Sequence, residues 1–208
     1  MKQLILASQS PRRKSLLAQL GYEFTTQPAD IDESVRGNES ATDYVIRLAE
    51  EKAQKIFINL PVQQQVKSIV LGSDTSVVID GHILGKPADE DECITTLQRL
   101  ENKEHRVLTA ISVITHDELN QNNKIISQLV ETKVQFKALS LDEIKRYWST
   151  GEPCDKAGSY AIQGIGGQFV TTIKGSYSAV VGLPLYETAQ LLAQVDLPST
   201  LNQAPIKD

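Results

Sequence analysis

Two adjacent arginines follow the first apolar stretch of the chain, within the segment ASQSPRRKSLL at residues 7–17. Ser10 and Pro11 are typical of a helix start, where serine caps free N–H groups and proline fits the first helical position. Arg12 and Arg13 are not explained in this way, because the positive end of a helix dipole favours acidic residues. They either face solvent or join an anion, for which N–H groups, hydroxyls and guanidinium groups form a site. The candidate phosphate-binding residues are therefore Ser8, Ser10, Arg12 and Arg13.

Carboxylates occur in two further segments. The loop PADIDESVRGNES at residues 28–40 contains three of them before its arginine, including Glu33, and could be no more than a solvated loop. Asp74 follows the apolar stretch of SIVLGSD, so we expect it at the carboxyl end of a strand, where side chains of α/β sheets commonly face a ligand; a turn or capping role is the alternative. Together, the two segments could hold Mg²⁺ or Mn²⁺ through oxygen ligands, and one carboxylate could deprotonate a water.

A lysine and a glycine-rich segment complete the set. Lys86 lies in LGKP, after an expected hairpin, where a lysine by itself usually indicates plain surface. The segment DKAGSYAIQGIGG at residues 155–167 has a glycine density that lets backbone approach a ligand, although tight strand turns would look the same. Cations that neutralise phosphate charge, beside carboxylates that hold a metal and a water, predict hydrolysis of a phosphoanhydride without a covalent intermediate.

The composition excludes several other classes. A chain of 208 residues with 40% hydrophobic and 23% charged residues fits one globular domain. The net charge of −5 argues against a broad nucleic-acid surface, and no apolar run approaches the roughly 20 residues that span a bilayer. The N-terminus predicts no signal peptide, and the isolated Cys93 and Cys154 predict reduced thiols in a cytoplasm rather than disulfides or zinc. A P-loop and a dinucleotide-binding glycine motif are both absent.

The pattern of elements predicts one α/β domain over residues 1–196, with a mixed sheet flanked by helices, and a frayed tail over residues 197–208. The expected helices are 12–20, 40–58, 89–100, 141–150 and 185–195. The expected strands are 4–7, 22–26, 68–74, a hairpin around 80–81, 106–115 and 125–136, with a polar turn between the last two. Residues 158–182 are expected to form short strands and tight turns.

Segments spread in order from about residue 4 to residue 195 resemble the Maf family of nucleoside triphosphate pyrophosphatases. They are SQSPRR, the Glu33 loop, RLAEEKA, GSDT, LGKP, DKAGSYAIQG and KGSYSAVVGLPL. The resemblance implies a cytoplasmic α/β enzyme with an elongated twisted sheet, related in fold to the inosine triphosphatases. It also implies a need for a divalent cation, cleavage between the α- and β-phosphates of a nucleoside triphosphate, and a homodimer.

Three positions resemble the branch of this family that acts on dTTP and UTP, namely Arg12 in SPRR, Thr75 in GSDT and Gln163 in AIQG. The carboxamide of Gln163 offers both a donor and an acceptor to the imide edge of thymine or uracil. The expected role is therefore house-cleaning hydrolysis of such nucleotides. The alternatives are a purine-type enzyme, for 7-methyl-GTP or inosine triphosphate, and a nucleotide-binding regulator of cell division and septum formation.

The resemblance also assigns roles to individual residues. Asp74 is expected to act as general base and to share the metal, and Glu33 to bind the metal or the water. The triphosphate is expected to lie against Ser8, Arg12, Lys52 and Lys86, with the helix start at Ser10 adding N–H donors and Lys86 counted among the catalytic residues. Arg13, Thr75 and Gln163 are the expected specificity positions, and Asp155 is a further candidate metal ligand.

Overall fold

The structure, a computed structural model, describes residues 2–117, 121–199 and 201. The strands of this part are β1 Gln3–Leu6, β2 Phe24–Thr26, β3 Ser68–Ile79, β4 His82–Leu84, β5 Glu104–Asp117, β6 Asn122–Phe136 and β7 Val170–Lys174. Its helices are α1 Pro11–Gln19, α2 Ala41–Asn59, α3 Val62–Gln65, α4 Glu90–Leu100, α5 Leu141–Trp148, α6 Tyr177–Val181 and α7 Leu185–Ala193. Three 3₁₀ segments are Glu152–Asp155, Ala157–Ser159 and Ile165–Phe169.

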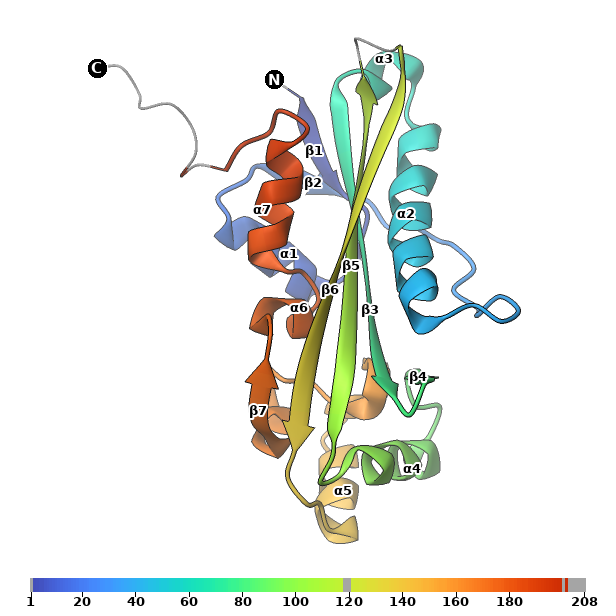
Figure 1. Ribbon diagram of the computed structural model, residues 1–208, viewed down its shortest axis with the longest axis vertical. Helices are drawn as coiled ribbons and strands as arrows, with labels where there is room; N and C mark the ends of the chain where they lie inside the picture. The colour runs from blue at the N-terminus through green and yellow to red at the C-terminus, as the bar shows by residue number, and fades with distance from the viewer. Residues whose placement is uncertain (1, 118–120, 200, 202–208) are drawn as a thin grey trace.

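The strands form one mixed, elongated and twisted sheet, as the sequence predicts (Figure 1). Its order is β2-β1-β3-β5-β6-β7, with β4 paired to β3. The pairs that β1 makes with β2 and β3 are parallel, and the others are antiparallel. The long β5–β6 hairpin forms the axis of the molecule (Figure 1).

Helices cover both faces of the sheet (Figure 1). On one face α2 packs against β1, β3 and β5, while α1, α6 and α7 pack on the opposite face, and α4 and α5 close one end. Because both faces are covered, β3 is a nearly continuous run of buried residues rather than an alternating one. None of the described helices combines the length and apolarity that crossing a membrane requires.

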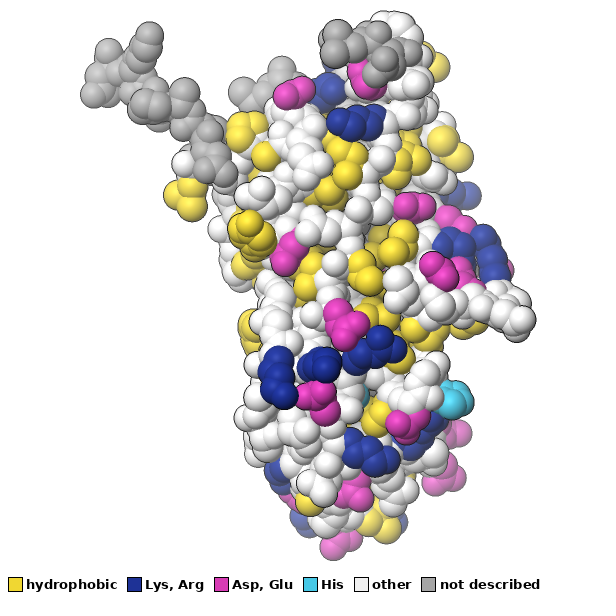
Figure 2. Space-filling model, viewed as in Figure 1, with side chains coloured by type: hydrophobic (Ala, Val, Ile, Leu, Met, Phe, Trp, Pro, Cys, Tyr) yellow, Lys and Arg dark blue, Asp and Glu magenta, His cyan; other side chains and the backbone are white. Residues whose placement is uncertain are grey.

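Figure 2 shows lysine and arginine side chains in a short row across the sheet, with acidic side chains beside the row. Arg106 pairs with Glu131, while Glu104 pairs with both Lys133 and Lys174. Each of these cations therefore lies beside a carboxylate that offsets part of its charge.

Polar side chains cap the first turn of several helices, as expected for Ser10. The hydroxyl of Ser10 accepts a hydrogen bond from the N–H of Arg13 at the start of α1, and Ser40 and Asp89 cap α2 and α4 in the same way. The β3–β4 hairpin turns at Asp80 and Gly81, both with positive φ, as predicted.

Asp74 is the main correction to the predicted elements. It does not end a strand, because β3 continues to Ile79 and Asp74 pairs with Ala110 of β5 in its middle. The other edge of β3, opposite β5, explains why Asp74 is accessible. Within the described residues, β1 pairs with β3 up to Leu71 and β4 pairs from Val77 onward, so Gly72–Ser76 face a gap between two strands.

The glycine-rich segment at residues 158–182 is also corrected. It contains one strand, β7, and one short helix, α6, and much of the remainder is 3₁₀ structure rather than strand. Of the predicted tail, Leu197 packs on the core and accepts a hydrogen bond from the hydroxyl of Tyr22. Residues 200 and 202–208 of that tail lie outside the described residues.

Candidate active site

A cavity of about 920 Å³ opens where β3 lacks a strand neighbour. Such a volume is typical of small-molecule sites, which span roughly 300–1,000 Å³. Every site residue predicted from the sequence lies on its wall. These residues are Ser8, Ser10, Arg12, Arg13, Glu33, Lys52, Asp74, Thr75, Lys86, Asp155 and Gln163. The fold thus brings together segments that are spread over more than 150 positions of the chain.

The alternation of side chains along β3 sends neighbouring residues to opposite sides of the sheet. Asp74 points toward α2, where Lys52 meets it. Thr75 points toward α1 and α6, where its hydroxyl accepts hydrogen bonds from Arg13 and Thr109. The cavity therefore straddles the sheet, with an acidic side and a cationic side that share one strand.

The cationic side is built on the start of α1. The Ser8 hydroxyl accepts a hydrogen bond from the N–H of Ser10, which fixes the chain just before the helix. Arg13 is held by the protein itself, because its Nε donates to the carbonyl of Gly182 at 2.9 Å and its Nη2 to Thr75 at 3.3 Å. Burial lowers the pKa of the Arg13 guanidinium, and the charge of Asp74 opposes this effect. Arg12, by contrast, forms an ion pair with Asp155, with 3.9 Å between Nη1 and Oδ2.

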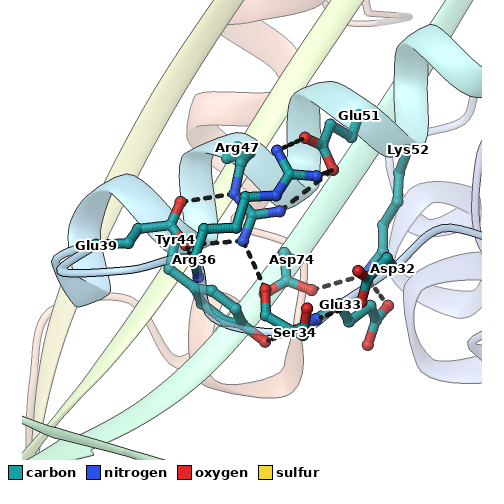
Figure 3. Close-up of polar contacts among 10 residues, drawn as sticks. All are labelled: Asp32, Glu33, Ser34, Arg36, Glu39, Tyr44, Arg47, Glu51, Lys52 and Asp74. Atoms are coloured by element: carbon teal, nitrogen blue, oxygen red, sulfur yellow. Dashed lines mark hydrogen bonds and ion pairs between the residues drawn. The ribbon is translucent and has the colours of Figure 1, made fainter.

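The acidic side gathers two carboxylates on one ammonium group (Figure 3). Lys52 Nζ lies 2.7 Å from Asp74 Oδ1 and 2.7 Å from Glu33 Oε1. The side chains of Lys52 and Asp74 are 9% and 10% exposed, whereas that of Glu33 is 49% exposed and faces the cavity. Burial alone would raise the pKa of Glu33, but the hydrogen bond and charge of Lys52 keep it below its ordinary value. Glu33 is therefore ionised at neutral pH.

Gly72 allows α2 to come close enough for this contact. A Cβ atom at Gly72 would lie 2.1 Å from the carbonyl oxygen of Ala49, which real structures do not tolerate. Gly72 is two residues before Asp74 and therefore on the same face of β3. The absence of a side chain at Gly72 thus lets the helix that carries Lys52 lie directly on the strand that carries Asp74.

A second set of ion pairs holds the loop that carries Glu33 (Figure 3). Arg47 donates from Nε and Nη2 to both oxygens of Glu39, at 2.6 and 2.7 Å, and from Nη2 to the carbonyl of Ser34 at 3.0 Å. Tyr44 donates from its hydroxyl to the carbonyl of Glu33 at 2.8 Å, and burial with nearby carboxylates raises its pKa to about 12. The loop is thus tied to α2 directly beside Glu33.

Sequence reasoning missed several of these supports. Arg47 and Glu51 stand four residues apart on α2 and are ion-paired, so their spacing could have identified them. Tyr44 carried no such signal. The carbonyl of Gly182, which accepts hydrogen bonds from both Arg13 and Ser73, could not be found from residue types at all.

Asp155 lies on the cavity wall but apart from the other two carboxylates. It pairs with the neighbouring Lys156, and this hydrogen bond is the main reason that its pKa lies below the ordinary value. In the described part of the chain no three acidic, histidine or cysteine side chains gather as a metal site. Of the three carboxylates predicted as metal ligands, Glu33 and Asp74 thus meet on Lys52, whereas Asp155 pairs with Lys156.

The arrangement can hold an anionic ligand between the two sides. Guanidinium, hydroxyl and N–H groups on one side suit phosphate oxygens, and ionised carboxylates on the other suit a hard cation or a water. One cavity thus provides separate groups for charge neutralisation and for proton transfer.

The sequence is similar to known proteins over nearly its whole length. The family model described as Maf-like protein matches residues 3–195. A protein named dTTP/UTP pyrophosphatase from Colwellia psychrerythraea is 58% identical over 97% of this chain and 92% of its own length. Proteins of the same name from Pseudoalteromonas translucida and Pseudoalteromonas atlantica are 57% and 53% identical, over 90% and 93% of this chain and 94% and 97% of theirs. The solved Staphylococcus aureus Ham1 protein matches with a TM-score of 0.37 and 14% identity, over 64% of this chain and 72% of that one. A similarity this low carries no conclusion about fold or function.

Proposed function

The chain belongs to the Maf family, and we propose that it hydrolyses dTTP and UTP to the nucleoside monophosphate and pyrophosphate. The observation that carries this function is the cavity at the middle of β3, where two carboxylates meet on Lys52 opposite the serines and arginines of α1. We interpret the activity as house-cleaning against non-canonical nucleotides. The names of the relatives do not favour the purine alternatives.

Asp74 is the general base of the proposed reaction. Its carboxylate accepts a proton from a water whose oxygen attacks the α-phosphorus, and the bond from this phosphorus to the bridging oxygen breaks as pyrophosphate leaves. Asp74 is fixed by a central strand and by Lys52, so its orientation is set before substrate arrives. Because it lies mid-strand beside a gap, a ligand reaches it without any strand having to move.

The triphosphate lies against the cationic side in this proposal. Arg12, Lys86, Ser8 and Ser10 line the cavity, and the two cations neutralise phosphate charge as it builds up on the leaving group. Lys52 already bridges two carboxylates, so we assign it the additional role of holding them in place.

A divalent cation fits the acidic side. Mg²⁺ is commonly bound by one or two carboxylates together with substrate phosphates, and Glu33 and Asp74 supply such a pair at the cavity. When bound, a cation of this kind polarises phosphoryl oxygens and lowers the pKa of bound water. Asp155 is left out of the proposed ligand set, because Lys156 and Arg12 already surround it.

Base selection is assigned to the part of the cavity wall that carries Gln163. Gln163 is exposed on the wall and offers a donor and an acceptor to the imide edge of a pyrimidine. Arg13 and Thr75 are hydrogen-bonded to each other, so we propose that they shape the pocket as one unit. A cytoplasmic location is supported by the two free cysteines, and a homodimer by the resemblance to the family alone.

Incubation with dTTP in ¹⁸O-labelled water, with Mg²⁺ or Mn²⁺, tests this function. We expect the label in dTMP and none in pyrophosphate, because attack occurs at the α-phosphorus. Label in pyrophosphate would contradict the proposed site of attack. A panel containing dTTP, UTP, inosine triphosphate and 7-methyl-GTP separates the pyrimidine from the purine function, and binding without turnover across the panel would favour a regulator of cell division.

A further inference from the structure

Glu152 lies outside the cavity and yet holds together the wall that carries Gln163. Glu152 begins the 3₁₀ segment after α5, and its side chain turns back onto the later loop. Oε2 accepts a hydrogen bond from the N–H of Ile165 at 2.8 Å, and Oε1 accepts one from the N–H of Gly166 at 2.9 Å. One carboxylate thus binds two successive backbone N–H groups thirteen and fourteen residues further along the chain.

Tyr147 of α5 completes this contact from the helix side. Its hydroxyl donates to Glu152 Oε1 at 2.7 Å and accepts from the N–H of Ala161 at 3.2 Å. The ring is buried and packs edge-to-face on Phe169 at 4.9 Å between centroids, so the hydroxyl has a fixed position. Tyr147 and Glu152 therefore bind backbone N–H groups on both sides of Gln163.

Two glycines in the loop leave the space that Glu152 and Tyr147 occupy. A Cβ atom at Gly164 would lie 2.1 Å from Glu152 Oε2, and one at Gly166 would lie 2.6 Å from the Tyr147 hydroxyl oxygen. The glycine-rich sequence suggests that backbone closely approaches a ligand. At Gly164 and Gly166 the backbone instead closely approaches the protein's own Glu152 carboxylate and Tyr147 hydroxyl. The cavity wall is formed by the residues between, which include Ala161, Ile162 and Gln163.

We propose that Glu152 is a positioning residue for substrate selection, which holds the loop of Gln163 at the distance from Asp74 that a pyrimidine nucleotide requires. The inference rests on the proposed function, since it gives Gln163 a base to read. The ionised carboxylate is needed because it accepts three hydrogen bonds at once, whereas a carboxamide has one acceptor oxygen. Burial would raise the pKa of Glu152, and these hydrogen bonds keep it below the ordinary value.

Glu152→Gln tests the proposal in the full-length protein. We expect KM for dTTP to rise roughly tenfold with kcat changed less than about threefold, because the loop binds the base and not the reacting phosphate. The preference for dTTP over dCTP should fall in parallel. Hydrogen exchange at the amides of Ile165 and Gly166 should become faster. Tyr147→Phe removes one hydrogen bond without changing charge and should shift both readouts in the same direction by less.

Glu143→Gln is the matched control. Glu143 also accepts a backbone N–H, that of Ser140, and pairs with Lys137 at the other end of α5, away from the cavity. It should leave KM, base preference and the exchange of Ile165 unchanged. Faster exchange in Glu152→Gln with unchanged KM and base preference would overturn the proposal, as would a loss confined to kcat. If the wild-type protein does not hydrolyse dTTP, the proposed function fails instead, while exchange at Ile165 still reports whether Glu152 holds the loop.

Discussion

Arg47 and Lys52 both lie on α2, and each is bound by two carboxylates, but the two sets of ion pairs have different roles. Arg47 binds Glu39 and Glu51 and also the carbonyl of Ser34, outside the cavity. Lys52 binds Glu33 and Asp74 on the cavity wall. Figure 3 shows the two sets side by side on the helix, joined by the loop that carries Glu33.

The difference follows from the chemistry of the two side chains. Arginine is a planar fork whose several donors fix a geometry. Arg47 uses Nε and Nη2 to hold the loop and Nη1 to bind Glu51 of its own helix. Its hydrogen bond with Glu39 raises its pKa further. Lysine is a point charge on a flexible stem, so Lys52 can keep two carboxylates together and still exchange partners when a cation or phosphate arrives. We therefore infer a structural role for the Arg47 set and, under the proposed function, a chemical role for the Lys52 set.

The largest effect is expected at Asp74. Asp74→Asn preserves shape but removes the proton acceptor, so turnover of dTTP should fall by about 10² to 10⁴-fold. Single-turnover rates measure this loss, and the thermal midpoint of unfolding checks that the fold is intact. Unaltered turnover would reject Asp74 as the base and leave the Lys52 set without a chemical role.

Lys52 is expected to affect both chemistry and stability. Lys52→Met leaves Asp74 and Glu33 unpaired, which should cost about 2 kcal/mol of unfolding free energy; the 3–5 kcal/mol typical of buried pairs is reduced because Glu33 is half exposed. Without the competing ammonium, the free protein should bind Mn²⁺ more tightly, measured by calorimetry without nucleotide. Equal or weaker binding of Mn²⁺ would show that Lys52 does not occupy a cation position.

Arg47→Lys tests whether the loop of Glu33 needs the two-nitrogen contact that the Arg47 guanidinium group makes with Glu39. A lysine keeps the charge but cannot hold Glu39 through two nitrogens, so the loop of Glu33 should loosen and KM for the metal–nucleotide complex should rise about three- to tenfold. Arg36→Lys is the comparison variant, because the Arg36 side chain is more exposed than that of Arg47 and binds Glu51 rather than Glu39 and the carbonyl of Ser34. Equal effects of the two variants would remove the distinction between a structural and a peripheral arginine.

The smallest effect concerns Glu33 and pH. Its pKa is lower in the folded protein than its ordinary value of 4.5, so its ion pair stabilises the fold at neutral pH and is lost as pH falls through the folded pKa. Half exposure limits the contribution to no more than about 1 kcal/mol. The gap in melting temperature between the wild type and Glu33→Gln should therefore be small at pH 7 and close below pH 4.5. A gap that widens in acid would mean that Glu33 is not held as an ion.

The sequence by itself determined the chemical inventory and the local structure of this protein. Ser10 as a helix cap, the turn at Asp80 and Gly81, and the alternation of helices and strands depend on residues close in the chain, so local propensity was sufficient. The predicted site residues proved to line one cavity for a related reason. Strongly charged side chains beside apolar segments stay near solvent, where a cavity wall can include them. The segments that resemble the family also occur in the family's order, so the family's site residues could be located in this sequence.

Only the tertiary structure decided how those residues are paired. Asp74 lies mid-strand rather than at a strand end because β5 extends the pairing past it, while β1 and β4 leave its other edge free. Arg13 is fixed by a carbonyl 169 positions away, and Glu152 by N–H groups whose location depends on the fold of the loop. Every residue type has a backbone carbonyl and every type but proline has a backbone N–H, so residue type does not reveal which of them is used. Such contacts cannot be recognised from residue types, and they decide which charged side chains are bound by the protein itself and which remain free to bind a ligand.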